Sequence, residues 1–263
     1  MALGWMDISD LSFNSLLLLE RVQIEWLFLS VPERALYVAL QANPIVKWYF
    51  EHKCPEINDK LQSIMENTTY DLSAAAAREA EVSIMKKIED WLVYAVDPSI
   101  YDSQEFLKWD SCELLSLADY EGKVVLDVGA GTGRLAFTVA GRAKAVYCVE
   151  PVGNMREYIK TKAHQNKVTN VYAVDGLITD IPFADDFSEI TMAGHVFGDD
   201  LEKEYAELMR VTKRKGKIIL CPGNSDKDNE IHRFLLARGF DWSRFGEPTD
   251  GIKRKYWKEK DSD

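Results

Sequence analysis

Apolar side chains recur every three or four positions from residue 1 to about residue 96, where glycine is almost absent. This spacing is typical of amphipathic helices. One predicted helix has an apolar face made of Leu19, Val22, Trp26 and Leu29. Three prolines divide the segment into several helices, since proline ends or kinks a helix: Pro32, Pro44 and Pro55.

Two more stretches of helical spacing follow. One should begin at the capping residue Ser73 and run through Ile84 and Trp91 to a stop near residue 97, and the other should span residues 102–117. The aromatic run 48–50 favours core packing over a substrate-binding face, because aromatic side chains in helices usually fill the interior.

Short β-branched runs alternate with helical segments after residue 123. The predicted strands are residues 124–128, 145–149, 171–174, 190–193 and 217–221, with helices at 135–140, around Tyr158 and at 201–211. Such alternation builds a parallel sheet with helices on both faces. Residues 240–245 and 252–257 are too close together for a helix between them, which predicts an antiparallel hairpin.

The 263 residues have room for one α/β domain and an appendage. We therefore expect an N-terminal helical region at residues 1–98, acting as a lid or substrate region, and a second domain at residues 99–263. The basic runs 213–215 and 253–255 are interpreted as solvated faces.

The composition indicates which classes of partner the protein can bind. A formal net charge of -11 argues against nucleic acid and favours a small molecule. The four cysteines are far apart, which predicts no metal site and no disulfide framework and favours a cytoplasmic protein. The apolar stretch 11–31 is interrupted by Glu20, Arg21 and Glu25, so neither a membrane span nor a signal peptide is expected.

The first predicted strand ends in Asp127 and Val128 and runs into Gly129-Ala130-Gly131-Thr132-Gly133. Glycine permits positive φ and close approach of a ligand, which suits a nucleotide-binding turn. A dinucleotide fingerprint would place its third glycine at position 134, where this chain has Arg134.

The acid and the Gly-x-Gly-x-Gly spacing together resemble motif I of the class I S-adenosylmethionine-dependent methyltransferases. The resemblance covers about residues 100–260. It implies an α/β fold with a doubly wound, mostly parallel seven-stranded sheet in the order 3-2-1-4-5-7-6, strand 7 being antiparallel, and an N-terminal helical extension. It also implies S-adenosyl-L-methionine as cofactor.

Further cofactor-binding residues follow the predicted strands. Glu150, about twenty residues beyond the glycine turn, is expected to accept hydrogen bonds from ribose hydroxyls. The resemblance implies that apolar residues after this acid cover the adenine, with Val152 and Met155 as candidates, Met155 being equally compatible with the core. Pro151, in the same segment, is a further candidate cofactor contact. It also implies that Asp175 and Gly176 contact the adenine amino group and a ring nitrogen.

The resemblance places the end of the fourth strand beside the sulfonium and the acceptor. His195 is therefore a candidate cofactor contact and general base, although a histidine there can simply line the site. Tyr101 and Trp109 are candidates for closing over the cofactor, and both are compatible with the core.

The expected function is methyl transfer to an oxygen, nitrogen or carbon nucleophile of a small-molecule acceptor by a monomer or homodimer. Three alternatives stay open: a non-catalytic cofactor-binding regulator, an aminopropyltransferase on the same fold, and a dinucleotide oxidoreductase, the last disfavoured by Arg134.

Overall fold

The computed structural model describes residues 5–66, 70, 72–249 and 251–261. The chain forms two compact units, residues 1–101 and 102–263. The division falls inside α7 (Pro98–Asp102), three residues after the predicted boundary. The roles assigned to the two parts stay predictions.

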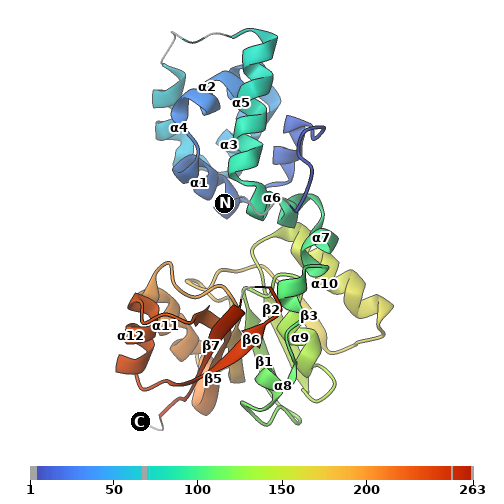
Figure 1. The fold of residues 1–263 in the computed structure, drawn as a ribbon, viewed down its shortest axis with the longest axis vertical. Coiled ribbons are helices and arrows are strands. Elements are labelled where there is room, and N and C mark those ends of the chain that lie inside the picture. The colour runs from blue at the N-terminus through green and yellow to red at the C-terminus, as the bar shows by residue number, and fades with distance from the viewer. Residues whose placement is uncertain (1–4, 67–69, 71, 250, 262–263) are drawn as a thin grey trace. The chain divides into compact units, whose positions relative to one another are not determined.

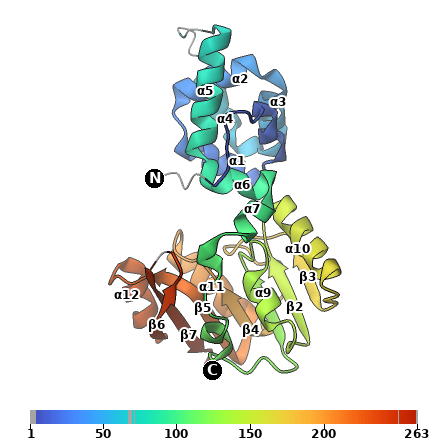
Figure 2. The same ribbon diagram turned by 45° about the vertical axis from the view of Figure 1, so that its right-hand side comes forward.

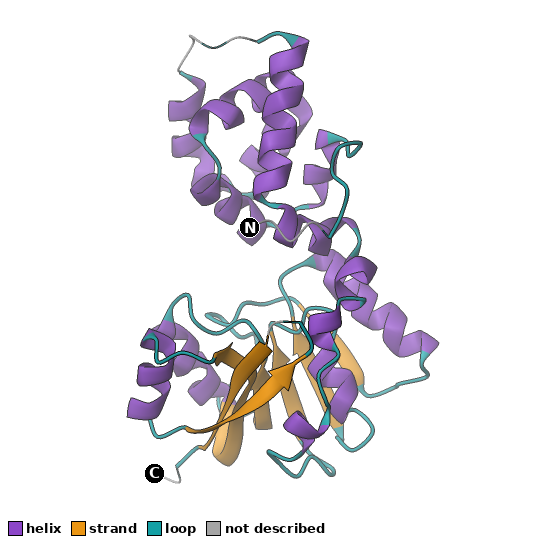
Figure 3. Cartoon of the chain, viewed as in Figure 1, coloured by secondary structure: helices purple, strands orange, loops and turns teal. Residues whose placement is uncertain are grey.

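The N-terminal unit is built from helices throughout its described residues (Figures 1 and 3). Besides α7, its elements are η1 (Phe13–Leu18), α1 (Arg21–Ser30), α2 (Glu33–Ala42), α3 (Pro44–Lys53), η2 (Pro55–Ile57), α4 (Asn58–Met65), α5 (Ala74–Lys87) and α6 (Glu89–Val96). The three prolines stand at the starts of α2, α3 and η2, as their fixed φ and missing N–H predict. Ser73 caps α5 by accepting a hydrogen bond from the Ala76 amide.

Three details of this unit differ from the sequence-based expectation. The buried residues of α1 are Gln23, Ile24, Leu27 and Phe28, whereas Leu29 is 81% exposed, because the helix begins only at Arg21 and its apolar stripe follows positions 24, 27 and 28. The helix expected to run to residue 97 breaks at Ile88, which separates α5 from α6. In the aromatic run, Phe50 is buried but Trp48 is 58% exposed, so core packing was the wrong expectation for Trp48.

The C-terminal unit contains one seven-stranded sheet in the order β3-β2-β1-β4-β5-β7-β6. Its strands are β1 (Val124–Val128), β2 (Ala145–Val149), β3 (Val171–Val174), β4 (Ser188–Ala193), β5 (Thr212–Ser225), β6 (Asp241–Glu247) and β7 (Gly251–Glu259). β1 to β5 pair in parallel, and β7 is antiparallel to both β5 and β6. The predicted fold class, strand order and hairpin are confirmed.

Helices cover both faces of this sheet (Figure 2). They are η3 (Glu105–Leu107), α8 (Cys112–Leu115), α9 (Arg134–Val139), α10 (Gly153–Gln165), α11 (Leu201–Val211) and α12 (Glu230–Ala237). Successive residues of β1 enter different cores, because side chains alternate along a strand. Val125 packs with α8, α9 and α10, and Leu126 packs with α11 and α12.

The helix predicted for residues 102–117 is replaced by η3, α8 and the irregular backbone between them. The reason lies in Arg134, whose guanidinium donates to the backbone carbonyls of Leu107 and Trp109 at 2.7 and 2.8 Å. A side chain from α9 thus takes acceptors that a continuous helix would use internally. The helix α12 was not predicted.

The basic run on β7 was also misinterpreted as solvated. Arg254 and Lys255 are 3% and 6% exposed. Arg254 lies 2.7 Å from carboxylate oxygens of both Asp226 and Asp228, and Lys255 lies 2.6 Å from Glu113. These acids come from distant parts of the chain, and they make burial of the cations possible.

A membrane-crossing helix would have to be longer and more apolar than any that the described residues form.

Candidate functional site

Four segments that the sequence singled out lie at the same edge of the sheet. The last residues of four parallel strands are paired in register: Val128, Val149, Val174 and Ala193. The residues that follow them directly are Gly129, Glu150, Asp175 and Gly194. The carboxyl edge of a doubly wound sheet is where such folds bind ligands.

The glycine loop is held against β2. The amides of Gly129 and Ala130 both donate to the carbonyl of Val149, at 2.8 and 3.1 Å. Gly129, Gly131 and Gly133 all have positive φ, at 66°, 54° and 80°. A Cβ on Gly129 would lie 2.6 Å from the side chain of Val196, so packing as well as φ requires glycine here.

Asp127 connects the end of β1 to α9. Its side chain is buried, and its Oδ2 accepts a 2.9 Å hydrogen bond from the backbone amide of Ala136 in the first turn of that helix. Burial raises the pKa of this carboxyl to about 7. Asp127 therefore ties the end of β1 to the start of α9, and its role as a cofactor contact stays a prediction.

Glu150 closes the loop from the side of β2. It is 6% exposed, and its two carboxylate oxygens accept hydrogen bonds from the amides of Gly131 at 2.8 Å and Val152 at 2.9 Å. Burial raises its pKa to about 7, while the two amides act in the opposite direction. Each oxygen of a carboxylate has two lone pairs, so both can accept one further hydrogen bond.

The segment after Glu150 begins α10. Val152 and Met155 are 2% and 1% exposed, and Pro151 is half-buried. Met155 lies on the buried side of the helix, which fits its core interpretation. The roles of Pro151 and Met155 at the adenine stay predictions.

Asp175 and Gly176 lie beyond the end of β3. The side chain of Asp175 is 75% exposed and pairs at 2.8 Å with Arg156, whose guanidinium also donates to the carbonyl of Glu150. A Cβ on Gly176 would lie 2.6 Å from Pro182 and 2.9 Å from Val149. The structure thus gives Gly176 a packing reason, in addition to the ligand approach expected from the sequence.

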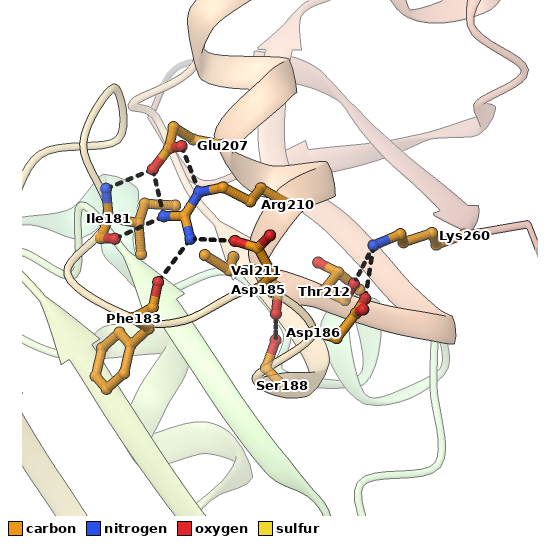
Figure 4. Close-up of polar contacts among 10 residues, drawn as sticks. All are labelled: Ile181, Phe183, Asp185, Asp186, Ser188, Glu207, Arg210, Val211, Thr212 and Lys260. Carbon is orange, nitrogen blue, oxygen red and sulfur yellow. Dashed lines mark hydrogen bonds and ion pairs between the residues drawn. The ribbon is translucent and has the colours of Figure 1, made fainter.

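The loop from Gly176 to β4 is held by Arg210 of α11 (Figure 4). Its guanidinium donates to the carbonyls of Ile181 and Phe183 at 2.8 and 2.7 Å, and it pairs with Glu207 and Asp185. The hydrogen bond with Glu207 raises the pKa of Arg210 above its usual range. This network fixes the chain that follows the predicted adenine contacts.

His195 follows β4 and makes a contact that the sequence did not indicate. Its Nε2 lies 3.0 Å from Oε1 of Glu247, the last residue of β6. The imidazole side chain is 32% exposed, whereas the carboxylate of Glu247 is fully buried. Glu247 was missed because the hairpin brings it to His195 from 52 positions away.

The two aromatic candidates lie in different units. Trp109 is 2% exposed, under the guanidinium of Arg134 and edge-to-face with Phe245, which makes it a core residue of the C-terminal unit. Tyr101 belongs to the N-terminal unit, where its ring contacts Trp5 and Tyr94 edge-to-face. Its role as a cofactor contact stays a prediction.

A cluster of possible metal ligands lies outside this site, at Glu25, Cys54 and Glu56 of the N-terminal unit. Burial and a hydrogen bond to Glu56 raise the pKa of the Cys54 thiol to about 11. The thiolate is the form that binds metals, so a metal ion would have to displace this proton. The expectation of a metal-free protein stays a prediction.

The C-terminal unit is similar to known methyltransferases. Residues 125–216 match a family described as "Methyltransferase domain". The demethylmenaquinone methyltransferase of Thermobifida fusca is 32% identical over 120 residues, 43% of this chain and 49% of that protein. An uncharacterized methyltransferase of Anoxybacillus flavithermus is 27% identical over 176 residues, 64% of this chain and 80% of that protein. The chain thus spans about half the length of the first of these relatives.

The fold is shared with a solved structure, a SAM dependent methyltransferase from Aquifex aeolicus, with a TM-score of 0.50 and 20% identity. The superposition covers 61% of this chain and 97% of that one. The family match lies wholly within the C-terminal unit, which has the predicted strand order and glycine loop. The C-terminal unit of this chain therefore contains a region that matches a methyltransferase-domain family, within a sheet of the strand order that the resemblance to class I S-adenosylmethionine-dependent methyltransferases implies.

Proposed function

We propose that this protein transfers the methyl group of S-adenosylmethionine to an oxygen, nitrogen or carbon nucleophile of a small-molecule acceptor. The observation that carries the proposal is the position of Glu150. Its buried carboxylate lies beside the glycine loop, already holds the amides of Gly131 and Val152, and retains lone pairs for a ribose diol.

The donors and acceptors at this edge fit the cofactor. Glu150 supplies the acceptor for ribose hydroxyls, and the exposed carboxylate of Asp175 supplies an acceptor for the adenine amino group. The glycine loop, with Gly129, Ala130, Gly131 and Gly133, faces the methionine portion. Pro151 and Met155 lie at the adenine in this arrangement.

S-adenosylmethionine supplies a methyl group that its sulfonium already makes electrophilic. The protein then has to align the acceptor, exclude water and accept a proton where the nucleophile carries one. His195 is the proposed general base, because its imidazole is partly exposed beyond β4 at the same edge of the sheet.

The wider assignments belong to the same proposal. The acceptor is a small molecule and not a nucleic acid, in keeping with a net charge of -11. The N-terminal helices serve as a lid or substrate region, and the protein acts in the cytoplasm as a monomer or homodimer. The relative named demethylmenaquinone methyltransferase adds quinols to the acceptors worth testing.

Calorimetric titration of the full chain with S-adenosylmethionine and, separately, with NAD tests the proposal. We expect binding of S-adenosylmethionine and none of NAD, and binding of NAD alone would refute it. An acceptor screen that includes phenols, quinols, amines and carboxylic acids then follows release of S-adenosylhomocysteine. Tight cofactor binding with no turnover by any acceptor would favour the regulator, and turnover of decarboxylated cofactor with a polyamine would favour the aminopropyltransferase.

A further inference from the structure

The imidazole of His195 is held from two sides. Its Nε2 lies 3.0 Å from Oε1 of Glu247, and the ring of Phe106 meets it edge-to-face with 5.8 Å between ring centroids. Within the part of the chain that the structure describes, no residue hydrogen-bonds to Nδ1. The contact to Glu247 therefore leaves one ring nitrogen available for another partner.

The surroundings of Glu247 define which nitrogen carries the proton. The carboxylate is fully buried at the end of β6, and its second oxygen lies 3.5 Å from Nζ of Lys253 on the facing strand. An ionised carboxylate can only accept hydrogen bonds. With Glu247 ionised, as the ammonium group of Lys253 favours, Nε2 of His195 is the donor and Nδ1 of the neutral ring keeps its lone pair.

The backbone at His195 is adapted to this contact. Its φ is +58°, in the left-handed region that residues with a Cβ seldom adopt, and its amide donates to the carbonyl of Pro222 at 2.9 Å. Such conformations are strained and occur preferentially at functional sites. The strained backbone and the buried acid together determine where the imidazole lies.

A second histidine in the same unit provides a contrast. His232 lies 3.6 Å from Asp228 through Nε2, and its Nδ1 hydrogen-bonds to the hydroxyl of Tyr256 at 3.1 Å. Its Nδ1 is hydrogen-bonded, its Nε2 faces a carboxylate, and it is only 5% exposed. His232 has the geometry of a structural histidine, which His195 lacks.

We propose that Glu247 is a positioning residue that holds His195 with Nε2 protonated, so that Nδ1 takes the proton of a hydroxylated acceptor such as a phenol or enol. The inference rests on the proposed function. A hydroxyl is the group that most needs such a base, because a neutral amine carries its own lone pair and loses its proton after the transfer.

When S-adenosylmethionine is bound, the acceptor forms a bond to the methyl carbon, the carbon–sulfur bond breaks, and its electron pair stays on sulfur. The hydroxyl proton passes to Nδ1 of His195, giving an imidazolium whose Nε2–H stays hydrogen-bonded to Glu247. Release of that proton to water restores the neutral ring.

The first test needs no turnover. Nitrogen-15 NMR of the histidine rings in the full chain, assigned with His195→Asn, should show His195 protonated on Nε2 and unprotonated on Nδ1 in its neutral form. Protonation on Nδ1 would overturn the proposal. In Glu247→Ala we expect the tautomer preference of His195 to weaken, while the matched variant Asp228→Ala leaves it unchanged.

The second test uses two acceptors of different acidity, 1,4-dihydroxynaphthalene and 4-nitrophenol, at an alkaline pH where only the latter is ionised. Glu247→Gln should lower kcat for the first acceptor by about tenfold or more, in line with the usual contribution of general bases, and leave kcat for the second within about twofold. KM for S-adenosylmethionine should not change. Equal loss with both acceptors, or loss with neither, would refute the role of Glu247.

Failure of the proposed methyltransferase function can be distinguished from failure of the inference about Glu247. If wild-type protein does not bind S-adenosylmethionine in the calorimeter, the methyltransferase proposal fails whatever the NMR tautomer. If it binds the cofactor and methylates amines but neither hydroxylated acceptor, the function stands and the inference about a hydroxyl acceptor is wrong. Thermal unfolding of Glu247→Gln and Glu247→Asp controls for misfolding, and Asp should restore part of the kcat lost with Gln.

Discussion

The carboxylate of Glu150 accepts a 2.8 Å hydrogen bond from the backbone amide of Gly131, nineteen positions earlier in the chain. The glycine loop after β1 is thereby tied to the end of β2. The acid that is proposed to bind the ribose also shapes the loop, so a substitution at Glu150 should affect both the proposed ribose contact and the geometry of the glycine loop.

Glu150→Gln should weaken binding of S-adenosylmethionine by about tenfold or more and lower the free energy of unfolding by about 1–3 kcal/mol, because one of the amides of Gly131 and Val152 would then face an NH₂ group. Calorimetry and thermal unfolding measure the two effects. Glu157→Gln on the exposed side of α10 is the matched control and should change neither. Unaltered affinity in Glu150→Gln would contradict the assigned role.

Binding of S-adenosylmethionine should depend on pH through Glu150. Burial raises the pKa of this carboxyl to about 7, and ribose hydroxyls donate to its ionised form. Binding therefore favours ionisation, so the affinity should rise as pH increases through 7, with release of protons. Calorimetry in buffers of different ionisation enthalpy measures this release. The dependence should persist in Asp127→Asn and disappear in Glu150→Gln, and a flat profile in wild type would exclude this mechanism.

The buried carboxyl of Asp127 leads to a separate prediction about how the free energy of unfolding depends on pH. Its pKa is raised by burial to about 7 from an ordinary value of 3.8, so the folded state favours the protonated form. The associated stabilisation is fully present below pH 3.8 and is lost as pH rises through 7. Relative to Asp127→Asn, whose amide oxygen can still accept from Ala136, wild type should lose about 3–4 kcal/mol of unfolding free energy between these limits.

Denaturant unfolding of both proteins across this pH range provides the measurement. If the free energy of unfolding of wild type and that of Asp127→Asn differ by the same amount at every pH, the Asp127 carboxyl stays in one protonation state throughout. Wild type gaining stability over the variant as pH rises would reverse the predicted sign.

Gly129→Ala should destabilise the fold by about 1–3 kcal/mol, because the new Cβ overlaps the side chain of Val196 and φ is +66°. Val196→Ala should relieve part of the overlap by removing both Cγ atoms, whereas the Cβ at 2.8 Å and the φ strain stay. The double variant should therefore recover part of the lost stability, with a coupling energy of about 0.5 kcal/mol or more between the two sites. Strict additivity would show that contact with Val196 is not the cause.

Local patterns determined much of the fold. β1, β2 and β3 begin and end at the predicted residues, and α11 spans the predicted range. The reason is that strand and helix periodicities are short-range properties of the sequence. The sheet order came from the family resemblance, which itself depends on the glycine turn and the acids at the strand ends. Glu150 and the glycine loop lie together because parallel strands bring their carboxyl ends to one edge.

Other features depend on contacts between residues distant in sequence. Arg254 and Lys255 are buried only because Asp226, Asp228 and Glu113 are folded against them, and the pattern of β7 contains no sign of those acids. Residues 105–111 avoid a continuous helix because Arg134 occupies two of their carbonyls. Side-chain partners of this kind override local propensity.

The sequence by itself determined the class of fold and the residues at the carboxyl edge of the sheet, because strand periodicity and glycine turns depend on residues that are close together in the sequence. Only the tertiary structure brought Glu247 to His195. The hairpin of β6 and β7 pairs with β5, and this register places a buried carboxylate 3.0 Å from the imidazole. A contact across 52 positions depends on how the sheet is assembled, which no local pattern specifies.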